Sequence, residues 1–455
     1  MTIDFVNKKA LVIGLARTGV SAAKLLSKLG AIVTVTDMKN ENALKDFSSS
    51  LPDGVKKMLG GHDGVSVSDY DLAVISPGVP WDAPLPASMR KAGVELVSEV
   101  EFAVRLIKKP LIAVTGSNGK STTTTLIGLM LKAAGKKVYV GGNIGAPLCD
   151  AVDGDYDWIV AEISSFQLEG IKTFKPRIGL ILNITEDHLD RHKTVNAYVA
   201  LKARVFENMD SGDTLIVNGD DAKTRTLDLP AGVKVLKFTH AHSSSSCAWI
   251  ENGKAVAQVG DIRVELFALD DLKIPGAHNV ENAISAGLTA LSAGVTPNII
   301  QNVIRSFEGL PHRMELVATI DNVNYINDSK GTNIDATLKS IEGFNKNLVL
   351  IAGGSNKGAD FSPLAKAIVK HAKGIVLIGE TAQAIKQELG SFEHIEMASS
   401  MEKAVIKASA FAKQGDTVLL SPACASFDMF KNFEDRGDAF KKSVGNLTGA
   451  IKDAC

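Results

Sequence analysis

The sequence predicts an α/β protein of three domains, each a mostly parallel sheet flanked by helices. Strand-like apolar runs alternate with helical patterns almost throughout the chain, which is typical of parallel sheets with crossover helices. The length of 455 residues corresponds to about three domains at ~150 residues each. Polar residues also cluster directly after several apolar runs, where open parallel sheets bind ligands.

The composition indicates a protein that captures small molecules at local sites. Hydrophobic residues make up 45% of the chain, which is ample for packed cores. A net charge of −1 points to neither nucleic acid nor an anionic membrane as a partner. The four cysteines are scattered, as suits a reducing compartment. The first residues lack a signal-peptide layout and no apolar run could span a bilayer. We therefore expect a cytoplasmic protein, and we expect it to be a monomer.

The first domain, residues 1–97, opens with a Rossmann-like pattern. A buried strand at 10–13 leads into a glycine turn, a helix, and a second strand that ends at Asp37. This arrangement is similar to a dinucleotide fingerprint with an acidic residue at the expected distance. The middle glycine is replaced by Ala16, where a pyrophosphate would need the closest backbone approach. Binding of NAD(P), binding of another nucleotide, and no nucleotide at all remain alternatives.

The central domain, residues 98–309, contains a pattern typical of a phosphate loop, as in P-loop ATPases. The apolar run LIAVTG predicts a strand, and STTTTLIGLMLKAAG predicts a helix closed by a glycine. Backbone amides at a helix start attract phosphate, and a lysine adds positive charge. Only two residues separate the glycines, whereas the standard loop has four. A plain turn between strand and helix is the alternative. The predicted phosphate-loop residues are Gly116, Ser117, Asn118, Gly119, Lys120, Ser121 and Thr122.

Two further strands of this domain end in acidic residues or histidine. The run DWIVAE ends at Glu162. In IGLILNITEDHLD the apolar run is followed by Glu186, Asp187 and His188. The carboxyl ends of parallel strands share one edge with the phosphate loop, so we expect a magnesium site there. For Glu162, a helix cap or a salt bridge is the alternative. A zinc-protease motif is excluded because Leu189 stands where the general base would be needed.

Lys202 lies in the apolar stripe of a predicted helix over 194–209. The stripe comprises Val195, Tyr198, Val199, Val205, Phe206 and Met209. Burial disfavours a charged ammonium, and a neutral amine can add carbon dioxide. The resulting carbamate would be an anionic oxygen ligand for magnesium. The alternative is that the long lysine stem carries its amine past the stripe to solvent.

The third domain, residues 310–455, again alternates strand and helix patterns and is predicted to be Rossmann-like. Polar segments follow its strands: DSKGTN after NVNYIN, SNKGADF after NLVLIAGG, and a long segment after TVLLSPACAS. Such segments are typical of ligand-binding edges, although asparagine, serine and glycine also favour ordinary turns.

Taken together, these motifs resemble the Mur ligases, ATP-dependent enzymes that form amide bonds in peptidoglycan synthesis. The resemblance covers essentially the whole chain, and T-G-[ST]-x-G-K-[ST] is this family's short phosphate loop. The Asp-Asn-Pro signature of the branches that add diaminopimelate or lysine is absent. The motifs resemble the branch that adds D-glutamate to UDP-N-acetylmuramoyl-L-alanine: GGNIG (141–145), EISSFQL (162–168), TEDHLD (185–190), GAHNVENA (276–283), GLPHRME (309–315), NDSKGTN (327–333) and SPACASFDMFKNFEDRG (421–437).

The resemblance implies a set of site residues, two magnesium ions, ATP, and an acyl-phosphate intermediate. Lys120, His188 and Lys202 are the implied catalytic residues, and Ser121, Glu162, His188 and carbamylated Lys202 the metal ligands. Asn279, Asn282, Arg313 and Asp328 are implied to bind ATP beside the phosphate loop. Asp37, Asn143, Lys330, Thr332, Lys357, Ser426 and Phe433 are implied to bind the two other substrates. Ala16, Arg17 and Lys39 depart from the family pattern in the first domain.

Two other functions compete with this interpretation. Folylpolyglutamate synthase is a relative that also adds glutamate, but it lacks a separate N-terminal nucleotide unit. A nucleotide-regulated binding protein would use ATP as a switch, but it would not need Glu162 and His188.

Overall fold

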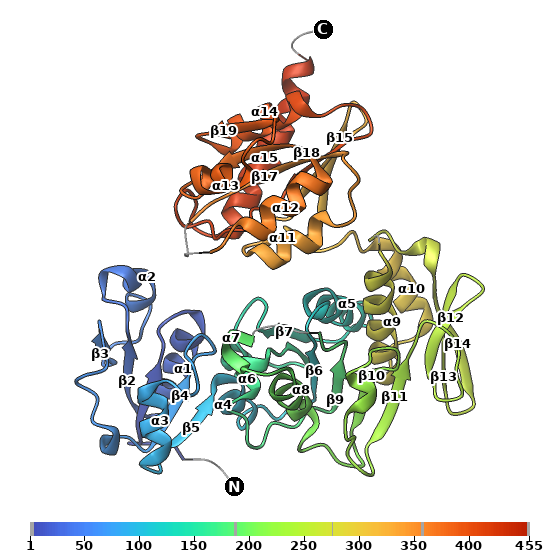
Figure 1. The fold of residues 1–455 in the computed structure, drawn as a ribbon. Helices are drawn as coiled ribbons and strands as arrows, with labels where there is room; N and C mark the ends of the chain where they lie inside the picture. The colour runs from blue at the N-terminus through green and yellow to red at the C-terminus, as the bar shows by residue number, and fades with distance from the viewer. Residues whose placement is uncertain (1–3, 186–188, 275, 356–358, 453–455) are drawn as a thin grey trace. The chain divides into compact units, whose positions relative to one another are not determined.

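The computed structural model describes residues 4–185, 189–274, 276–355 and 359–452, and it confirms the predicted α/β class. Three sheets, each mostly parallel and flanked by helices, follow one another along the chain (Figure 1). They form two compact units: Met1–Phe307 holds the first two sheets, and Glu308–Cys455 holds the third. The units are described separately below.

The first sheet is wholly parallel in the order β3-β2-β1-β4-β5. The predicted strand, glycine turn, helix and second strand are β1, the turn at Gly14, α1 and β2. The strand order reverses direction at β1 and β4, which is where such sheets bind ligands. Its elements are β1 (Lys9–Ile13), α1 (Arg17–Lys28), β2 (Ile32–Asp37), η1 (Asn42–Leu44), α2 (Lys45–Ser48), β3 (Lys56–Leu59), η2 (Val67–Asp69), β4 (Leu72–Ile75), α3 (Pro84–Lys91) and β5 (Glu95–Ser98).

The second sheet has the order β14-β13-β12-β11-β10-β9-β6-β8-β7. It is parallel from β7 to β12, and β12, β13 and β14 pair antiparallel. Its strands are β6 (Leu111–Thr115), β7 (Val138–Gly142), β8 (Trp158–Glu162), β9 (Ile178–Ile181), β10 (Thr214–Asn218), β11 (Lys234–Phe238), β12 (Ala248–Glu251), β13 (Lys254–Val259) and β14 (Ile262–Ala268). Its helices are α4 (Glu99–Val104), α5 (Lys120–Ala133), η3 (Leu148–Ala151), α6 (Ser165–Leu168), α7 (Leu189–His192), α8 (Val195–Ala203), η4 (Arg204–Phe206), η5 (Thr224–Thr226), η6 (Leu269–Asp271), α9 (Ala277–Ser292) and α10 (Pro297–Ser306).

The predicted helix over 194–209 is shorter than expected. Helix α8 begins after Thr194, whose side chain accepts a hydrogen bond from the Ala197 amide, and it ends at Ala203. The next turn, η4, is a 3-10 turn, a common way for an α-helix to tighten at its end. Tyr198, Lys202 and Phe206 are buried nonetheless, so the predicted stripe does face the interior.

The third sheet has the order β15-β16-β20-β17-β18-β19, with only the edge strand β15 antiparallel. Alternate residues of β17 enter two cores: Leu348 and Leu350 face α11, α12 and α13, while Val349 and Ile351 face α14 and α15. Helices therefore cover both faces. The elements are β15 (Glu315–Ile320), β16 (Val323–Asn327), α11 (Ile334–Ile341), β17 (Leu348–Ala352), α12 (Ser362–His371), β18 (Ala372–Ile378), α13 (Ala382–Leu389), β19 (Ile395–Ala398), α14 (Met401–Phe411), β20 (Thr417–Leu420) and α15 (Phe433–Lys452).

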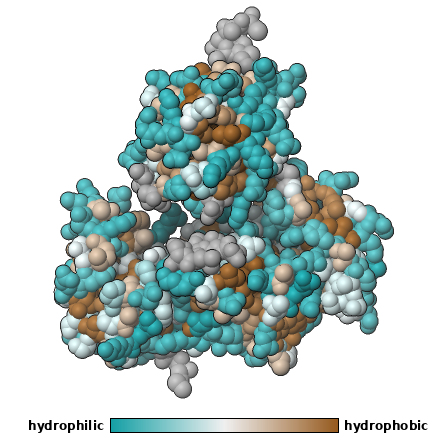
Figure 2. All heavy atoms as spheres, viewed as in Figure 1, coloured by the Kyte–Doolittle hydropathy of each residue, from teal (hydrophilic) through white to brown (hydrophobic). Residues whose placement is uncertain are grey.

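No helix of the described residues is long and apolar enough to cross a membrane. The face seen in Figure 2 carries many hydrophilic residues, and its hydrophobic residues lie in smaller groups between them. Large hydrophobic side chains are thus concentrated in the cores of the sheets.

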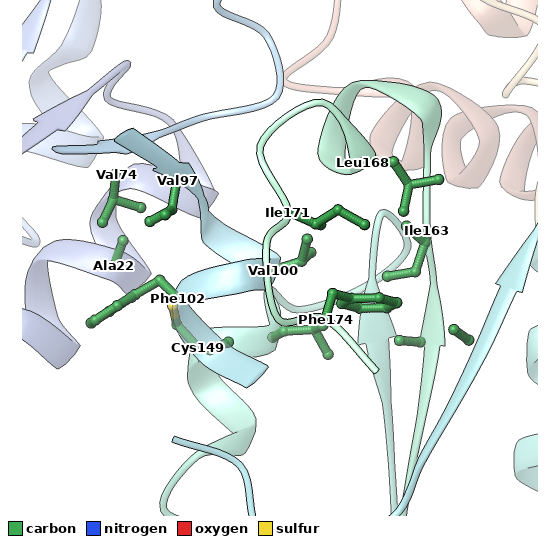
Figure 3. Packing of buried hydrophobic residues seen from close by; sticks show 14 of the residues in the cluster. Ala22, Val74, Val97, Val100, Phe102, Cys149, Ile163, Leu168, Ile171 and Phe174 are labelled. Atoms are coloured by element: carbon green, nitrogen blue, oxygen red, sulfur yellow. The ribbon is translucent and has the colours of Figure 1, made fainter. Parts of the chain in front are cut away.

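One hydrophobic core joins the first two sheets. Figure 3 shows Val74 and Val97 of the first sheet on one side, and on the other Ile163 and Phe174, which lie in the segment between β8 and β9 of the second sheet. Val100 of α4 lies between them in this view and is fully buried. Because this core is continuous, the edges of the two sheets are held in a defined relation within one unit.

Helix α4 also contains two buried glutamates, whose pKa values are shifted in opposite directions. The Glu99 carboxylate accepts a 2.6 Å hydrogen bond from the Cys149 amide, but its other oxygen has no partner among the described residues. Burial therefore raises the pKa of Glu99 to about 7. Burial would also raise the pKa of Glu101, but hydrogen bonds from the Lys172 amide, Arg105 and Thr173 outweigh it and lower that pKa. Glu99 thus costs stability at neutral pH, whereas Glu101 contributes to it.

Glu99→Gln should stabilise the protein at neutral pH but not in acid. The folded state holds the Glu99 proton up to about pH 7, whereas an ordinary glutamate releases it near 4.5. The stability linked to this proton is complete below pH 4.5 and is lost as the pH rises to 7. Above pH 7 the variant should gain on the order of 3 kcal/mol in the free energy of unfolding. Urea titrations at several pH values measure this gain, and Glu101→Gln should instead lose stability, most at neutral pH.

Candidate active site

The predicted phosphate loop connects β6 to α5 and depends on two glycines. Gly116 has φ of 151° and Gly119 has φ of 82°, both in the region that side chains rarely adopt. A Cβ atom on Gly119 would lie 2.0 Å from the Asn282 side-chain oxygen of α9. The short loop therefore leaves space for no side chain between α5 and α9 at this position.

Two lysine ammonium groups donate hydrogen bonds to the same carbonyl oxygen of this loop. Lys120 Nζ lies 2.9 Å from the Gly116 oxygen and also 2.9 Å from the Ser117 oxygen. Lys202 Nζ reaches the Gly116 oxygen from α8 at 2.8 Å. Lys202 is 1% exposed, so the alternative in which its amine reaches solvent is wrong. The loop therefore concentrates positive charge beside its backbone, as an anion site requires.

An oxygen-rich cluster lies at the adjacent strand end. Ser121 Oγ donates a 2.6 Å hydrogen bond to Glu162, and Asn143 Nδ2 donates a 2.7 Å hydrogen bond to its other oxygen. Glu162 ends β8, between β6 and β7 in the sheet, and it is 3% exposed. A buried carboxylate next to a hydroxyl has the donor chemistry that magnesium prefers. The helix-cap and salt-bridge alternatives for Glu162 are not observed among the described residues.

The opposite wall of the phosphate loop is held by the segment after β9 and by α8. The Ser117 and Asn118 amides donate to the backbone and side-chain oxygens of Asn183, each at 2.9 Å. Ser117 Oγ donates to the Thr185 carbonyl at 3.0 Å and lies 3.1 Å from the Tyr198 hydroxyl. These hydrogen bonds from Ser117 and Asn118 therefore fix the conformation of the loop. Thr122 lies in the first turn of α5.

Asn279 and Asn282 lie on the first turns of α9, as predicted. The Asn282 amide donates a 3.2 Å hydrogen bond to the Asn279 side-chain oxygen. Asn282 also packs directly on Gly119. The structure thus brings this pair to the predicted phosphate loop.

Two predicted site residues, His188 and Lys357, lie outside the described residues, as do Glu186 and Asp187. Within the part of the chain that the structure describes, no three histidine, cysteine, aspartate or glutamate side chains form a metal cluster. The predicted metal ligands that can be placed are therefore Ser121, Glu162 and Lys202, whose donors include a hydroxyl and an amine.

Asp37 closes the glycine turn of the first sheet. Its carboxylate accepts hydrogen bonds from the amides of Leu15 (2.7 Å) and Lys39 (2.8 Å). Gly14, with φ of 93°, is held from the other side by Ser76, whose hydroxyl donates to the Gly14 oxygen at 2.8 Å. Asp37 therefore shapes the turn at the switch point of the sheet, where we expected a substrate contact.

The third sheet gathers its predicted residues at one edge, within the second unit. Asp328 follows β16, and its carboxylate accepts hydrogen bonds from Ser340 (2.6 Å) and Ser421 (2.8 Å). Burial raises the pKa of Asp328 despite these hydrogen bonds and the nearby positive charge of Arg313. Lys330 Nζ lies 5.2 Å from the centre of the Phe433 ring. Thr332 follows on the same loop with its amide bonded to the Lys330 oxygen, and Ser426 is buried after β20.

Arg436 is a residue that the sequence analysis did not single out. It is fully buried, and its guanidinium donates to the Ser329 hydroxyl (3.0 Å), the Ser329 oxygen (2.9 Å) and the Cys424 oxygen (3.0 Å). Burial lowers its pKa to about 10. Arg436 thus ties together the loops after β16 and β20. The sequence offered one signal for this residue: Arg436 is a charged residue one turn after Phe433 on an amphipathic helix.

Family models match each of the three parts of the chain. Residues 8–98 match "Mur ligase MurD-like, N-terminal domain", residues 114–290 match "Mur ligase middle domain", and residues 312–424 match "Mur ligase, glutamate ligase domain". The matches follow the same order as the three sheets.

Curated relatives match nearly the full chain. UDP-N-acetylmuramoylalanine--D-glutamate ligase of Pelotomaculum thermopropionicum is 44% identical over 98% of this chain and 99% of its own. The protein of that name from Clostridioides difficile is 40% identical over 98% and 100%. Among solved structures, UDP-N-acetylmuramate-alanine ligase MurC of Thermotoga maritima has a TM-score of 0.57, with 20% identity over 97% of this chain and 100% of that chain. MurF ligase from Thermotoga maritima in complex with ADP has a TM-score of 0.54, with 15% identity over 97% and 96%. These structures support the fold.

Gly119→Ala should weaken nucleotide binding at the predicted phosphate loop. The new methyl group would collide with the Asn282 side chain and would also strain a left-handed backbone position. We expect the affinity for a non-hydrolysable ATP analogue to fall by at least tenfold, measured by calorimetry, as expected for displaced phosphate donors.

Gly135→Ala is the matched control. Gly135 also has positive φ, but a Cβ atom there would meet nothing within 4 Å. This variant should lose about 1 kcal/mol of stability and keep its affinity for the analogue. Equal loss of affinity in both variants would show that backbone strain, and not the contact with α9, controls the loop.

Proposed function

Because this chain belongs to the Mur ligase family, we propose that it joins D-glutamate to UDP-N-acetylmuramoyl-L-alanine at the expense of ATP. The observation that carries the proposal is the full-length match to curated ligases of that name, at 40–44% identity. The short phosphate loop with Glu162 at the neighbouring strand end supports it from the structure. Such a reaction is a step of peptidoglycan synthesis, and the enzyme would work in the cytoplasm as a monomer.

The three domains would divide the substrates between them. Residues 1–97 would bind the UDP part, residues 98–309 ATP, and residues 310–455 the incoming amino acid. Asn143 and Asp37 would contact UDP-N-acetylmuramoyl-L-alanine. Lys330, Thr332, Lys357, Ser426 and Phe433 would surround D-glutamate, whose two carboxylates need cationic and hydroxyl donors. This set of side chains, next to a buried arginine, suits a dianionic ligand.

The carboxylate of the UDP substrate must be activated before an amine can attack it. Transfer of the γ-phosphate of ATP to this carboxylate would give an acyl phosphate and ADP. The amine of D-glutamate would then attack the acyl carbon, and phosphate would leave. Lys120 would exchange its loop carbonyls for the β- and γ-phosphates, and Asn279, Asn282, Arg313 and Asp328 would bind the rest of ATP.

The oxygen donors around Glu162 fit magnesium. Ser121 and Glu162 would hold one ion, and His188 with a modified Lys202 would serve a second. Bound magnesium would neutralise the repulsion between the γ-phosphate and the substrate carboxylate. Within the protein itself, Asn143 and Ser121 orient the Glu162 carboxylate by hydrogen bonds to its two oxygens.

The environment of Lys202 favours a carbamate. Its buried amine shares one carbonyl oxygen with the ammonium of Lys120, so two positive charges face each other in a desolvated site. A neutral amine relieves this repulsion. Its lone pair can form a C–N bond with carbon dioxide and release one proton, which leaves an anionic oxygen pair in place of a cation.

D-glutamate should support phosphate release in the presence of ATP and UDP-N-acetylmuramoyl-L-alanine. L-glutamate, L-lysine and diaminopimelate should not, because a site built for one stereoisomer leaves polar groups unpaired with another. A coupled phosphate assay across these amino acids measures the preference. Turnover with L-lysine equal to that with D-glutamate would contradict the assignment to this branch, although the family would stand.

Lys202→Ala should lose most activity, and acetate or formate should restore part of it. The small carboxylate would occupy the place of the carbamate oxygens. Phosphate release with and without acetate measures the rescue, and isotope-labelled bicarbonate with carbon NMR detects the carbamate itself. Lys254→Ala, which changes an exposed lysine of β13, is the control that acetate should leave unaffected. Wild-type protein that is fully active and shows no carbamate signal would refute the modification.

A further inference from the structure

A buried polar network in the first unit connects the glycine turn of the first sheet with the phosphate loop of the second. We propose that its central members, Glu169, Arg191 and His192, are positioning residues that hold these two loops in the relative placement the reaction needs. The proposal rests on the ligase function proposed above and adds residues that none of the predicted site sets contains.

The first half of the network is built by Arg191 of α7. Its guanidinium donates to the carbonyl oxygens of Pro77 (3.2 Å) and Val79 (3.0 Å), in the loop after β4. That loop packs directly on the glycine turn: a Cβ atom on Gly14 would lie 2.8 Å from Val79 Cγ2. Arg191 therefore attaches the central domain to the segment that shapes the switch point of the first sheet.

Glu169 holds Arg191 and His192 together. Its carboxylate accepts hydrogen bonds from Arg191 Nη2 (2.5 Å) and Nε (3.3 Å), and it lies 3.6 Å from His192 Nδ1. The side chains of Glu169 and Arg191 are only 10% and 14% exposed. A shielded pair with this many contacts has a single geometry, unlike an exposed ion pair on the surface.

The second half of the network is built by His192, whose side chain is 1% exposed. Its Nε2 lies 3.0 Å from the Ser165 hydroxyl, on α6 just after Glu162. Its ring centre lies 5.3 Å from that of Phe166 and 5.4 Å from that of Tyr198. Both ring nitrogens therefore lie near polar groups of the central domain, and the ring packs beside two of its aromatic side chains.

Tyr198 carries the connection to the phosphate loop. Its hydroxyl lies 3.1 Å from Ser117 Oγ, and its ring lies 4.6 Å from Lys202 Nζ. A shift of His192 would displace this ring, and with it the wall of the loop and the buried amine. Displacements below 1 Å at such positions are enough to slow a reaction that needs aligned groups.

The Ser165–His192–Glu169 arrangement is similar in connectivity to a nucleophile, base and acid, but it does not suit nucleophilic catalysis. Ser165 is 2% exposed, so no substrate reaches its hydroxyl. The same contacts, in a buried position, serve to fix the orientation of the imidazole. Positioning is therefore the role that accounts for both the polarity and the burial of the network.

The test compares His192→Phe, which keeps the ring packing and removes both nitrogens, with His192→Gln, which can retain a donor toward Ser165. His192→Phe should lower kcat by about tenfold or more, as misaligned reacting groups do. Its dissociation constants for a non-hydrolysable ATP analogue and for UDP-N-acetylmuramoyl-L-alanine, each measured alone, should change by less than about threefold. His192→Gln should recover part of kcat. Glu169→Gln, which keeps the shape of Glu169, should repeat the pattern of His192→Phe.

His242→Phe is the control, since His242 packs on Trp249 in the antiparallel part of the sheet, away from the network. It should keep the kcat of the wild type. The proposal is overturned if His192→Phe and Glu169→Gln keep kcat within about twofold. It is also overturned if the single-ligand affinities and the melting temperature fall in proportion to kcat, because that is general destabilisation. A wild-type protein without D-glutamate-dependent phosphate release would reject the proposed function itself, and this proposal with it.

Discussion

The geometry of the central site depends on one carbonyl oxygen, that of Gly116, which accepts hydrogen bonds from Lys120 and Lys202. The loop contains two residues fewer between its glycines than a standard phosphate loop, so its backbone turns sharply and needs positive φ at both glycines. Lys120 comes from the helix that follows the loop, whereas Lys202 comes from a helix some 80 residues later. The shared oxygen therefore holds both side chains beside the same loop.

Parallel pairing explains why chemically related residues meet although they are distant in sequence. Strands β7, β8 and β6 are neighbours, so Asn143 after β7, Glu162 at the end of β8 and Ser121 at the start of the helix after β6 form one hydrogen-bonded cluster. The same principle operates in the third sheet. There, β16 and β20 are neighbours, and the loops that follow them are joined by Arg436.

Buried charges distinguish the parts of the molecule that serve stability from those that serve a site. Glu101 is surrounded by donors from Arg105 and from the segment after α6, and this compensates its burial. Glu99 and Arg436 are buried with less compensation, so their pKa values shift against the charged form and each costs folding free energy. Lys202 contacts the loop after β6, and Arg436 contacts the loops after β16 and β20. Glu99 lies in the core between the first two sheets, where it makes stability depend on pH.

The sequence by itself determined the fold class, the strands and helices that carry the motifs, and the short glycine loop between β6 and α5. Alternating apolar runs and glycine-rich turns are local signals, and Gly116 to Ser121 and Glu162 follow the strands as their residue order predicts. The apolar period of its helix predicted that Lys202 is buried, and the structure confirms this. Only the tertiary structure decided where that lysine's amine points, since its partner, the Gly116 oxygen, is distant in sequence. The same holds for Asp37, which binds the Leu15 amide, for Arg436 and for the contacts of Glu169 with Arg191 and His192. Hydrogen bonds between distant segments depend on how the sheets and helices pack. The periodic patterns in the sequence predict strands and helices, but they do not predict which distant side chains meet.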